Sequence, residues 1–282
     1  MGGVDTDAGR WVEVGDGVLA RRYTELDLTV GLVLGGERAL VVDTRGDERQ
    51  GAEWAAAVRA VTALPIEVVL THAHFDHCFG TAAFLPCPVH AHPACRAAIT
   101  ATAAAQRAEW AACYHEHGDP ATADALTATR PVLPDHRVDP AVTLDLGGRS
   151  ADLRYLGRGH TDHDLVVHVP DSAVVLAGDL LEQGAPPDFG DAFPADWPHT
   201  VTALLALGPR TVVPGHGDPM DPGEVAEQRD ALAEVAALHA AVGAREIDAG
   251  TAERRSPYPG VPWSGVPRTA THPPEKGDSR AG

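Results

Sequence analysis

The sequence predicts an α/β protein in which two β-sheets lie back to back between layers of helices. Strand-like and helix-like segments alternate along the chain, and they form two similar blocks, which is typical of two sheets that each carry helices on one face. The chain has 282 residues, of which 44% are hydrophobic, enough for a substantial core. We therefore expect one large domain over residues 1–245 and a Pro/Gly-rich tail over residues 246–282.

The first block runs from short β-rich segments to a cluster of histidines. Residues 47–61 have helical periodicity, with Trp54, Val58 and Val61 on one face, and Pro65 ends that region. The strand that follows delivers the chain to the histidines at its carboxyl end, where α/β folds tend to bind ligands. The elements expected in this block are strands over 11–23, 28–36, 38–44 and 66–71, and a helix over 47–61.

The second block contains two hairpins and two helices. The hairpins have "GG" and "PDS" at their turns, and the last strand is expected to stop at Pro214. The expected elements from residue 93 onward are a helix over 93–117, a Pro-rich loop over 128–140, hairpins over 141–157 and 164–179, a helix over 198–208, a strand over 210–217 and a helix over 223–245.

Composition excludes several classes of partner. The formal net charge is -18, and such an acidic chain repels nucleic acid phosphates and anionic lipid. No apolar run reaches the roughly 18 residues that a membrane span needs. The four cysteines form no C-x-x-C pair and we recognise no signal peptide, so we expect a cytoplasmic protein, and the residue usage is typical of a GC-rich bacterial genome.

The stretch "LTHAHFDHCFG", residues 70–80, is the densest chemistry in the chain. Residues i and i+2 of an extended segment point the same way, so His72 and His74 can share one metal ion. The chain must then turn, and Asp76 and His77 suit a second metal beside the first. Imidazole and carboxylate ligands suit Zn²⁺, and also Fe or Mn.

Further ligands are expected from loops that follow strand-like runs. His160 lies in "GRGHTDHD", Asp179 in "VVLAGDLLE" and His216 in "VVPGHGD". Asp179 would bridge two cations, one bound by His72, His74 and His160, the other by Asp76, His77 and His216. Two cations about 3.5–4 Å apart lower the pKa of a bridging water toward neutrality. The resulting hydroxide would hydrolyse a carboxylic ester, thioester, lactone or lactam of a small molecule, with Asp76 as the catalytic residue that orients it or relays its proton.

Four motifs in this order, "THAHFDH", "GRGHTD", "LAGD" and "PGHG", resemble the metallo-β-lactamase superfamily. The resemblance implies a four-layer αββα sandwich of two mixed β-sheets flanked by helices, with a dinuclear zinc site at one edge. Asp179 stands where antibiotic-degrading members often carry cysteine or serine, so the chain is more similar to the wider hydrolase branch, including glyoxalase II and lactonase relatives. An iron-dependent redox enzyme of the oxygenase type is the alternative, because the same scaffold hosts such enzymes.

Residues around the predicted ligands have two interpretations each. Asp43 would accept a hydrogen bond from a ligand histidine or start a turn. Cys78 would bind metal as a thiolate or be a small buried residue, and we expect the second because the seven ligands are already complete. Gly80 is expected to allow close helix packing. His163 would reach the substrate or be solvated, and we favour the second. The aromatic residues of the loop after Asp179 would form an apolar wall for the substrate or pack the loop onto its sheet; they are Phe189, Phe193 and Trp197.

Overall fold

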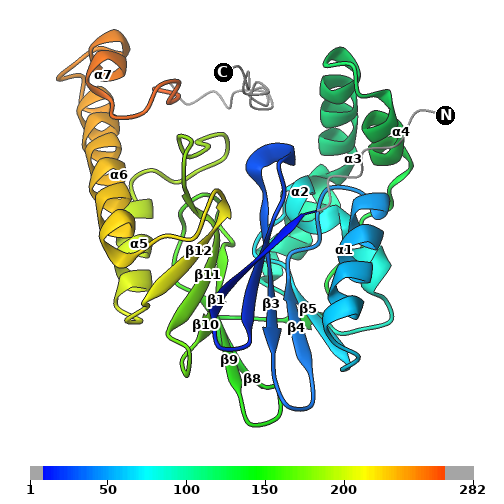
Figure 1. Cartoon of the computed structure of the whole chain (residues 1–282). Helices are drawn as coiled ribbons and strands as arrows, with labels where there is room; N and C mark the ends of the chain where they lie inside the picture. The colour runs from blue at the N-terminus through cyan, green and yellow to red at the C-terminus, as the bar shows by residue number, and fades with distance from the viewer. Residues whose placement is uncertain (1–8, 264–282) are drawn as a thin grey trace, which may run out of the picture.

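Two β-sheets packed face to face form the centre of the structure, a computed structural model that describes residues 9–263 (Figure 1). The first sheet has seven strands in the order β1 (Arg10–Gly15), β2 (Val18–Arg22), β3 (Thr29–Leu34), β4 (Ala39–Val42), β5 (Ile66–Val69), β6 (Val89–Ala91) and β7 (His136–Arg137). The second has five strands in the order β12 (Thr211–His216), β11 (Val174–Glu182), β10 (Leu165–Val169), β9 (Ser150–Tyr155) and β8 (Ala141–Asp145). Both sheets combine parallel and antiparallel pairs.

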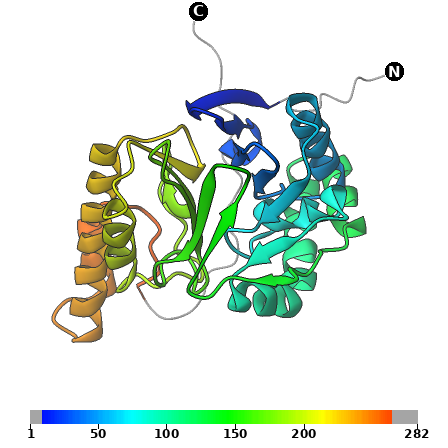
Figure 2. The same ribbon diagram turned by 90° about the horizontal axis from the view of Figure 1, so that it is seen from below.

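Helices cover the outer face of each sheet (Figures 1 and 2). The first sheet carries α1 (Glu48–Val61), α2 (Phe75–Cys78), η2 (Phe79–Phe84), α3 (Pro93–Glu116) and α4 (Pro120–Ala128). The second carries α5 (Trp197–Leu205), α6 (Pro222–Gly243) and α7 (Ala249–Arg255), and η1 (Glu25–Asp27) lies in the turn between β2 and β3. This arrangement confirms the predicted αββα sandwich. None of the helices within residues 9–263 is long and apolar enough to cross a membrane.

Three layers of apolar side chains hold the four layers together. One lies between the first sheet and its helices, one between the two sheets, and one between the second sheet and its helices. A fully buried tryptophan anchors each outer layer: Trp54 of α1 donates its indole N–H to the Asp43 carbonyl at 3.1 Å, and Trp197 of α5 donates to the Leu180 carbonyl at 3.0 Å. Both tryptophans therefore bind the backbone beside strand ends that carry polar side chains.

The parallel strand pairs bring four strand ends to one edge of the sandwich. β4 pairs in parallel with β5, and β11 pairs in parallel with β12. β5 and β11 are buried along their whole length, which explains why both are nearly continuous apolar runs in the sequence. The sheets are joined at this edge because Leu165 N–H donates to the Thr71 carbonyl at 2.9 Å.

Two elements differ from the expectation. β12 does not stop at Pro214 but continues to His216, because β12 is an edge strand, where proline's missing N–H removes no ladder hydrogen bond. Helix α4 is not among the predicted elements, although Asp119 caps it by accepting a hydrogen bond from Thr122 N–H and Pro120 stands at its first position.

The chain after α6 folds back onto that helix. Ala252 of α7, Val261 and Trp263 are buried in the outer layer beside α6. Part of the predicted 246–282 tail is thus packed on the second sheet's helices, and residues 264–282 lie outside the described residues. The domain division at residue 245 stays a prediction.

Candidate metal centre

The segment after β5 changes from extended chain to helix within the histidine cluster. His74 is the last extended residue, with φ -74° and ψ 148°, and the single turn of α2 begins at Phe75. His72 and His74 therefore precede the turn, whereas Asp76 and His77 lie inside it. This is the change of direction that the spacing predicted.

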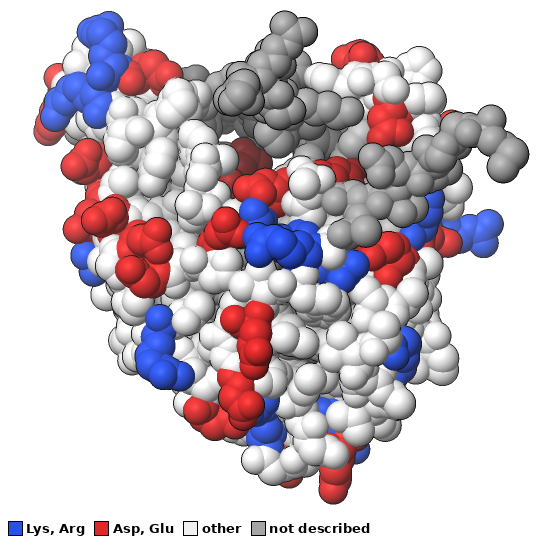
Figure 3. All heavy atoms as spheres, viewed as in Figure 1, with Lys and Arg blue, Asp and Glu red and all other residues white. Residues whose placement is uncertain are grey.

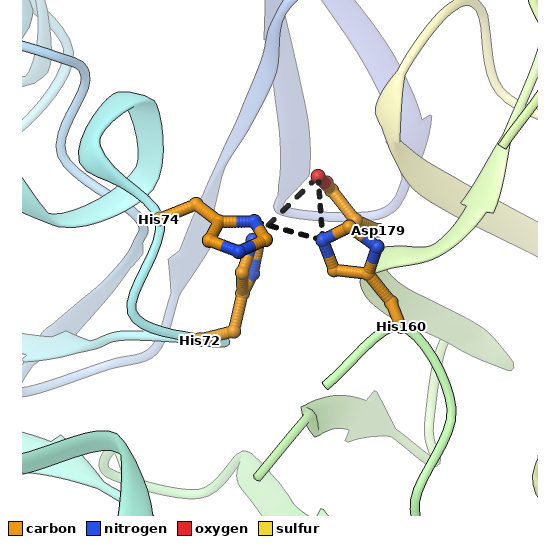
Figure 4. Close-up of side chains that lie close together, drawn as sticks. All are labelled: His72, His74, His160 and Asp179. Carbon is orange, nitrogen blue, oxygen red and sulfur yellow. Dashed lines mark hydrogen bonds and ion pairs between the residues drawn. The ribbon is translucent and has the colours of Figure 1, made fainter. Parts of the chain in front are cut away.

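Four side chains from both sheets converge in a first cluster (Figure 4). His72, His74, His160 and Asp179 each offer one donor atom, and these atoms all lie within 4.8 Å of one another. His160 Nε2 lies 2.9 Å from His74 Nδ1, and Asp179 Oδ2 lies 3.5 Å from both His72 Nε2 and His160 Nε2.

A second cluster lies on the other side of Asp179. The donor atoms of Asp76, His77 and His216 also lie within 4.8 Å of one another. His216 Nε2 is 3.3 Å from Asp76 Oδ2 and 3.3 Å from His77 Nε2. Asp179 reaches this cluster as well, with Oδ1 3.1 Å from His77 Nε2 and Oδ2 3.4 Å from His216 Nε2. The structure thus brings together all seven residues singled out in the sequence.

Each of the five histidines has an acceptor next to the ring nitrogen that faces away from the clusters. The contacts are His72 Nδ1 to Thr71 Oγ1 at 3.0 Å, His74 Nε2 to Asp191 Oδ1 at 3.3 Å, His77 Nδ1 to Asp43 Oδ2 at 2.8 Å, His160 Nδ1 to the Asp188 carbonyl at 3.2 Å, and His216 Nδ1 to the Leu26 carbonyl at 2.7 Å. An acceptor on one nitrogen places the proton there and leaves the lone pair of the other nitrogen free. With the proton on the outward nitrogen of each ring, the five inward nitrogens face the clusters and can bind a cation.

Two buried ligand atoms of the clusters have no hydrogen-bond partner in the described structure. They are His72 Nε2 and Asp179 Oδ1, and both face the clusters. Burial lowers the pKa of His72 well below its ordinary value, so the ring is neutral. Burial alone would raise the pKa of Asp179, but the adjacent His77 and His216 hold it well below its ordinary value. Unpaired buried groups are costly, and a cation between these atoms removes that cost, so the residues fit a metal.

Asp43 combines the two roles that the sequence left open. It has φ 63° at the turn after β4, and its carboxylate accepts from Thr71 N–H at 2.8 Å, from Thr71 Oγ1–H at 2.7 Å and from His77. Because Thr71 Oγ1 donates its proton to Asp43, it can accept from His72 Nδ1–H. One buried carboxylate therefore orients a histidine of each cluster.

Glycines allow the backbone to approach the clusters closely. A Cβ on Gly215 would lie 1.8 Å from Asp179 Oδ1, so a side chain there would displace the carboxylate. A Cβ on Gly80 would lie 2.0 Å from the Thr44 carbonyl and 2.8 Å from Gly51 Cα of α1, which confirms the predicted close packing. Cys78 is fully buried, as expected.

The predicted solvation of His163 is wrong. The side chain is 3% exposed, and its Nε2 accepts a hydrogen bond from Ala73 N–H at 3.2 Å. The aromatic residues of the loop after β11 pack mainly inward: Phe189 and Trp197 lie in the outer core, and Arg158 stacks over Phe193 at 4.6 Å. The sequence did not single out Asp191, whose contact with His74 depends on the path of this loop.

Comparison with known proteins agrees with this fold and site. The sequence profile of the "Metallo-beta-lactamase superfamily" matches residues 24–216. The chain is 26% identical over 209 residues to "Metallo-beta-lactamase type 2" of Bacillus cereus, covering 72% of each chain. It is 34% identical over 91 residues to the protein of that name from Bacteroides fragilis, a match spanning 30% of this chain and only 36% of that relative.

Solved structures share the fold at low sequence identity. The metallo-beta-lactamase FIM-1 from Pseudomonas aeruginosa, in its mono-zinc form, has a TM-score of 0.61 at 20% identity, covering 80% of this chain and 95% of that one. A metallo-beta-lactamase from Pontibacter korlensis has a TM-score of 0.61 at 20% identity, covering 80% and 99%.

The sandwich with its edge cluster of histidines and carboxylates defines a metal-dependent hydrolase. The chain belongs to the metallo-β-lactamase superfamily, as its four motifs indicated.

Proposed function

We propose that the protein is a dinuclear zinc hydrolase that cleaves a carboxylic ester, thioester, lactone or lactam of a small molecule. One zinc ion would be held by His72, His74 and His160, the other by Asp76, His77 and His216, with Asp179 shared. The observation that carries this proposal is the orientation of the five histidines, whose inward ring nitrogens lie around Asp179 while their outward nitrogens have acceptors.

The donor set favours zinc. It consists of imidazoles and carboxylates, with no thiolate: the only cysteine in the histidine stretch, Cys78, is buried, and burial raises its pKa well above the ordinary value. Iron and manganese accept the same ligands, so the metal itself must be measured. The distances from Asp179 to both clusters support two ions rather than one.

Bound zinc would supply Lewis acidity, activating water near neutral pH and polarising the carbonyl of the substrate. The chain's own contribution is to hold the donor atoms and to accept and release protons. Asp76 is suited to proton transfer because its carboxylate lies on the first turn of α2, with Oδ2 3.3 Å from His216 Nε2. Burial would raise the pKa of Asp76, but His77 and His216 lower it below its ordinary value, so its carboxylate is ionised.

The acidic surface favours a small neutral substrate over an anionic one. Acidic and basic side chains are both spread over the face shown in Figure 3, and the formal net charge of the chain is -18. Within residues 9–263, Asp76, Asp179 and Asp191 form ion pairs with histidines only. We therefore propose no nucleic acid and no membrane as partner.

The first experiment is metal analysis of the purified protein together with a substrate panel. The panel contains thioesters, lactones, simple esters, cephalosporins and phosphodiesters. We expect two zinc ions per chain and hydrolysis within the carbonyl substrates. Asp76→Ala should fold normally and lose about 10²–10⁴-fold in kcat/KM.

Asp124→Ala is the matched control, because Asp124 is an exposed aspartate on α4. It should retain wild-type turnover. Wild-type turnover of Asp76→Ala would contradict the role of Asp76. One iron per chain without hydrolysis would replace the proposal by a redox enzyme of the oxygenase type.

A further inference from the structure

Ala73, the residue between His72 and His74, has both of its backbone polar groups bound by side chains. Its N–H donates to His163 Nε2 at 3.2 Å, and its carbonyl accepts from Gln106 Nε2 at 3.0 Å. The two partners come from different elements: His163 precedes β10 of the second sheet, and Gln106 lies on α3 outside the first sheet.

Ala73 lies beyond the end of β5 and has no sheet partner, so these two hydrogen bonds satisfy its peptide groups instead. Ala73 is 1% exposed, so water cannot satisfy its peptide groups, and an unpaired buried group costs about 1–3 kcal/mol. The chain thus uses two side chains to fix the single residue that separates two candidate ligands.

The ring of His163 is itself fixed. Because Nε2 accepts from Ala73, the proton resides on Nδ1, which lies 2.6 Å from Asp162 Oδ1 and donates to it. The His163 N–H of the backbone donates to Thr161 Oγ1 at 3.1 Å. Both the direction and the tautomer of the imidazole are therefore set by Ala73 at Nε2 and by Asp162 at Nδ1.

We propose that His163 and Gln106 are positioning residues that hold the Ala73 peptide and thereby set the separation of the His72 and His74 rings. Neither side chain forms a hydrogen bond with any of the seven candidate ligands within the described structure, so each acts through Ala73. A rotation of this peptide would move both imidazoles, which belong to the same cluster. The inference rests on the proposed metal site but not on the reaction catalysed there.

The test compares three variants by metal binding. His163→Phe keeps a ring but removes the acceptor, whereas His163→Gln keeps an acceptor near the position of Nε2. Gln106→Leu removes the donor to the Ala73 carbonyl. Zinc affinity is measured on metal-free protein by competition with a chromophoric chelator, and the site geometry by the visible absorption spectrum of the Co²⁺-substituted protein.

His163→Phe should weaken one of the two zinc ions by about 10–100-fold and alter the Co²⁺ spectrum. His163→Gln should restore most of the affinity and the wild-type spectrum. Gln106→Leu should act in the same direction with a smaller loss, and because Gln106 is partly exposed, this variant also tests the inference if His163→Phe does not fold.

His168→Phe is the control for loss of a largely buried histidine. His168 lies on β10, and its nearest charged partner is Asp152 at 3.9 Å, away from the clusters. The His168→Phe variant should bind zinc with the affinity of the wild-type protein. An equal loss of affinity in His168→Phe and His163→Phe, or unchanged zinc binding in both His163→Phe and Gln106→Leu, would overturn the inference alone. Wild-type protein that binds no zinc would instead overturn the proposed function.

Discussion

The two ligand clusters differ in what holds their histidines. In the second cluster, His77 binds Asp43, which is 2% exposed at the end of β4, and His216 binds the Leu26 carbonyl. In the first cluster, His74 contacts Asp191, whose side chain is 59% exposed. His160 binds the Asp188 carbonyl in the same surface loop between β11 and α5.

The second metal position thus depends more on buried groups, whereas two of the three histidines of the first depend on a surface loop. Groups held by buried, multiply bonded partners keep their geometry, whereas groups held by an exposed loop change when the loop moves. We therefore expect the second cluster to be the more preorganised of the two. The first would respond to changes in the loop, which is also where a substrate would contact the protein.

Replacing the shared carboxylate, Asp179, should weaken metal binding in both clusters alike. Asp179→Asn removes the negative charge of a carboxylate that contacts both clusters, so the affinity for both metal ions should fall by more than about 100-fold, beyond the effect of losing an outer partner. Equilibrium dialysis with zinc measures the stoichiometry. Retention of one tightly bound ion would show that Asp179 serves a single cluster.

Replacing the buried carboxylate should affect the second cluster directly at His77 and the first cluster through Thr71 and His72. Asp43→Asn can still accept from Thr71 N–H but leaves His77 Nδ1–H and Thr71 Oγ1–H without their shared acceptor. We expect a loss of about 10–100-fold in metal affinity, and about 1–3 kcal/mol in the free energy of unfolding of the metal-free protein. Chelator competition and urea unfolding measure the two effects. A stability unchanged from wild type would contradict the assignment of Asp43 to the rigid part of the site.

Replacing the loop carboxylate should affect the first cluster without a cost in stability. Asp191→Asn should lower metal affinity by about 10-fold, the lower end of the range for an outer partner, because Asp191 is exposed. Asp188→Asn is the matched control in the same loop: it removes a charge but keeps the backbone carbonyl that binds His160. If both variants lose affinity equally, the effect is one of loop charge and not of the contact with His74.

A pH titration tests a region outside both clusters, where no change in metal affinity is expected. Glu67 accepts from Arg38 at 2.7 Å and from His90 Nε2 at 2.8 Å. Burial lowers the pKa of His90 below its ordinary 6.5. Burial would raise the pKa of Glu67, but Arg38 and His90 lower it below 4.5. Both groups bind protons more weakly in the folded state, so their stabilisation is present above the ordinary pKa values and is lost as the pH falls.

Urea unfolding of metal-free protein between about pH 4 and 7.5 should therefore show stability falling from about pH 6.5 downward, with Glu67→Gln less steep at the acid end. At neutral pH Glu67→Gln should cost about 1.5–3 kcal/mol, the value of hydrogen bonds to a charged group. The exposed Glu227→Gln should leave the profile unchanged. A Glu67→Gln profile parallel to that of wild type would assign the slope to other groups.

The sequence predicted the ligand residues better than the residues that hold those ligands in position, and the reason is physical. His72, His74, Asp76 and His77 are close in the chain, and His160, Asp179 and His216 follow strands or glycine turns, so local pattern and strand ends locate them. Asp191, Gln106 and His163 reach the site only through the path of a loop, the rotation of α3 and the contact between sheets. No periodicity in the chain encodes these three features.

The shared edge where the two sheets meet has a consequence for folding. Candidate ligands come from the segment after β5 and from three separate places in the second half of the chain, so a bound ion would join the two halves as a crosslink does. An ion that binds only the folded protein adds about 2.7 kcal/mol of stability at a free concentration one hundred times its Kd. Metal supply would then determine how long the chain survives unfolding and proteolysis.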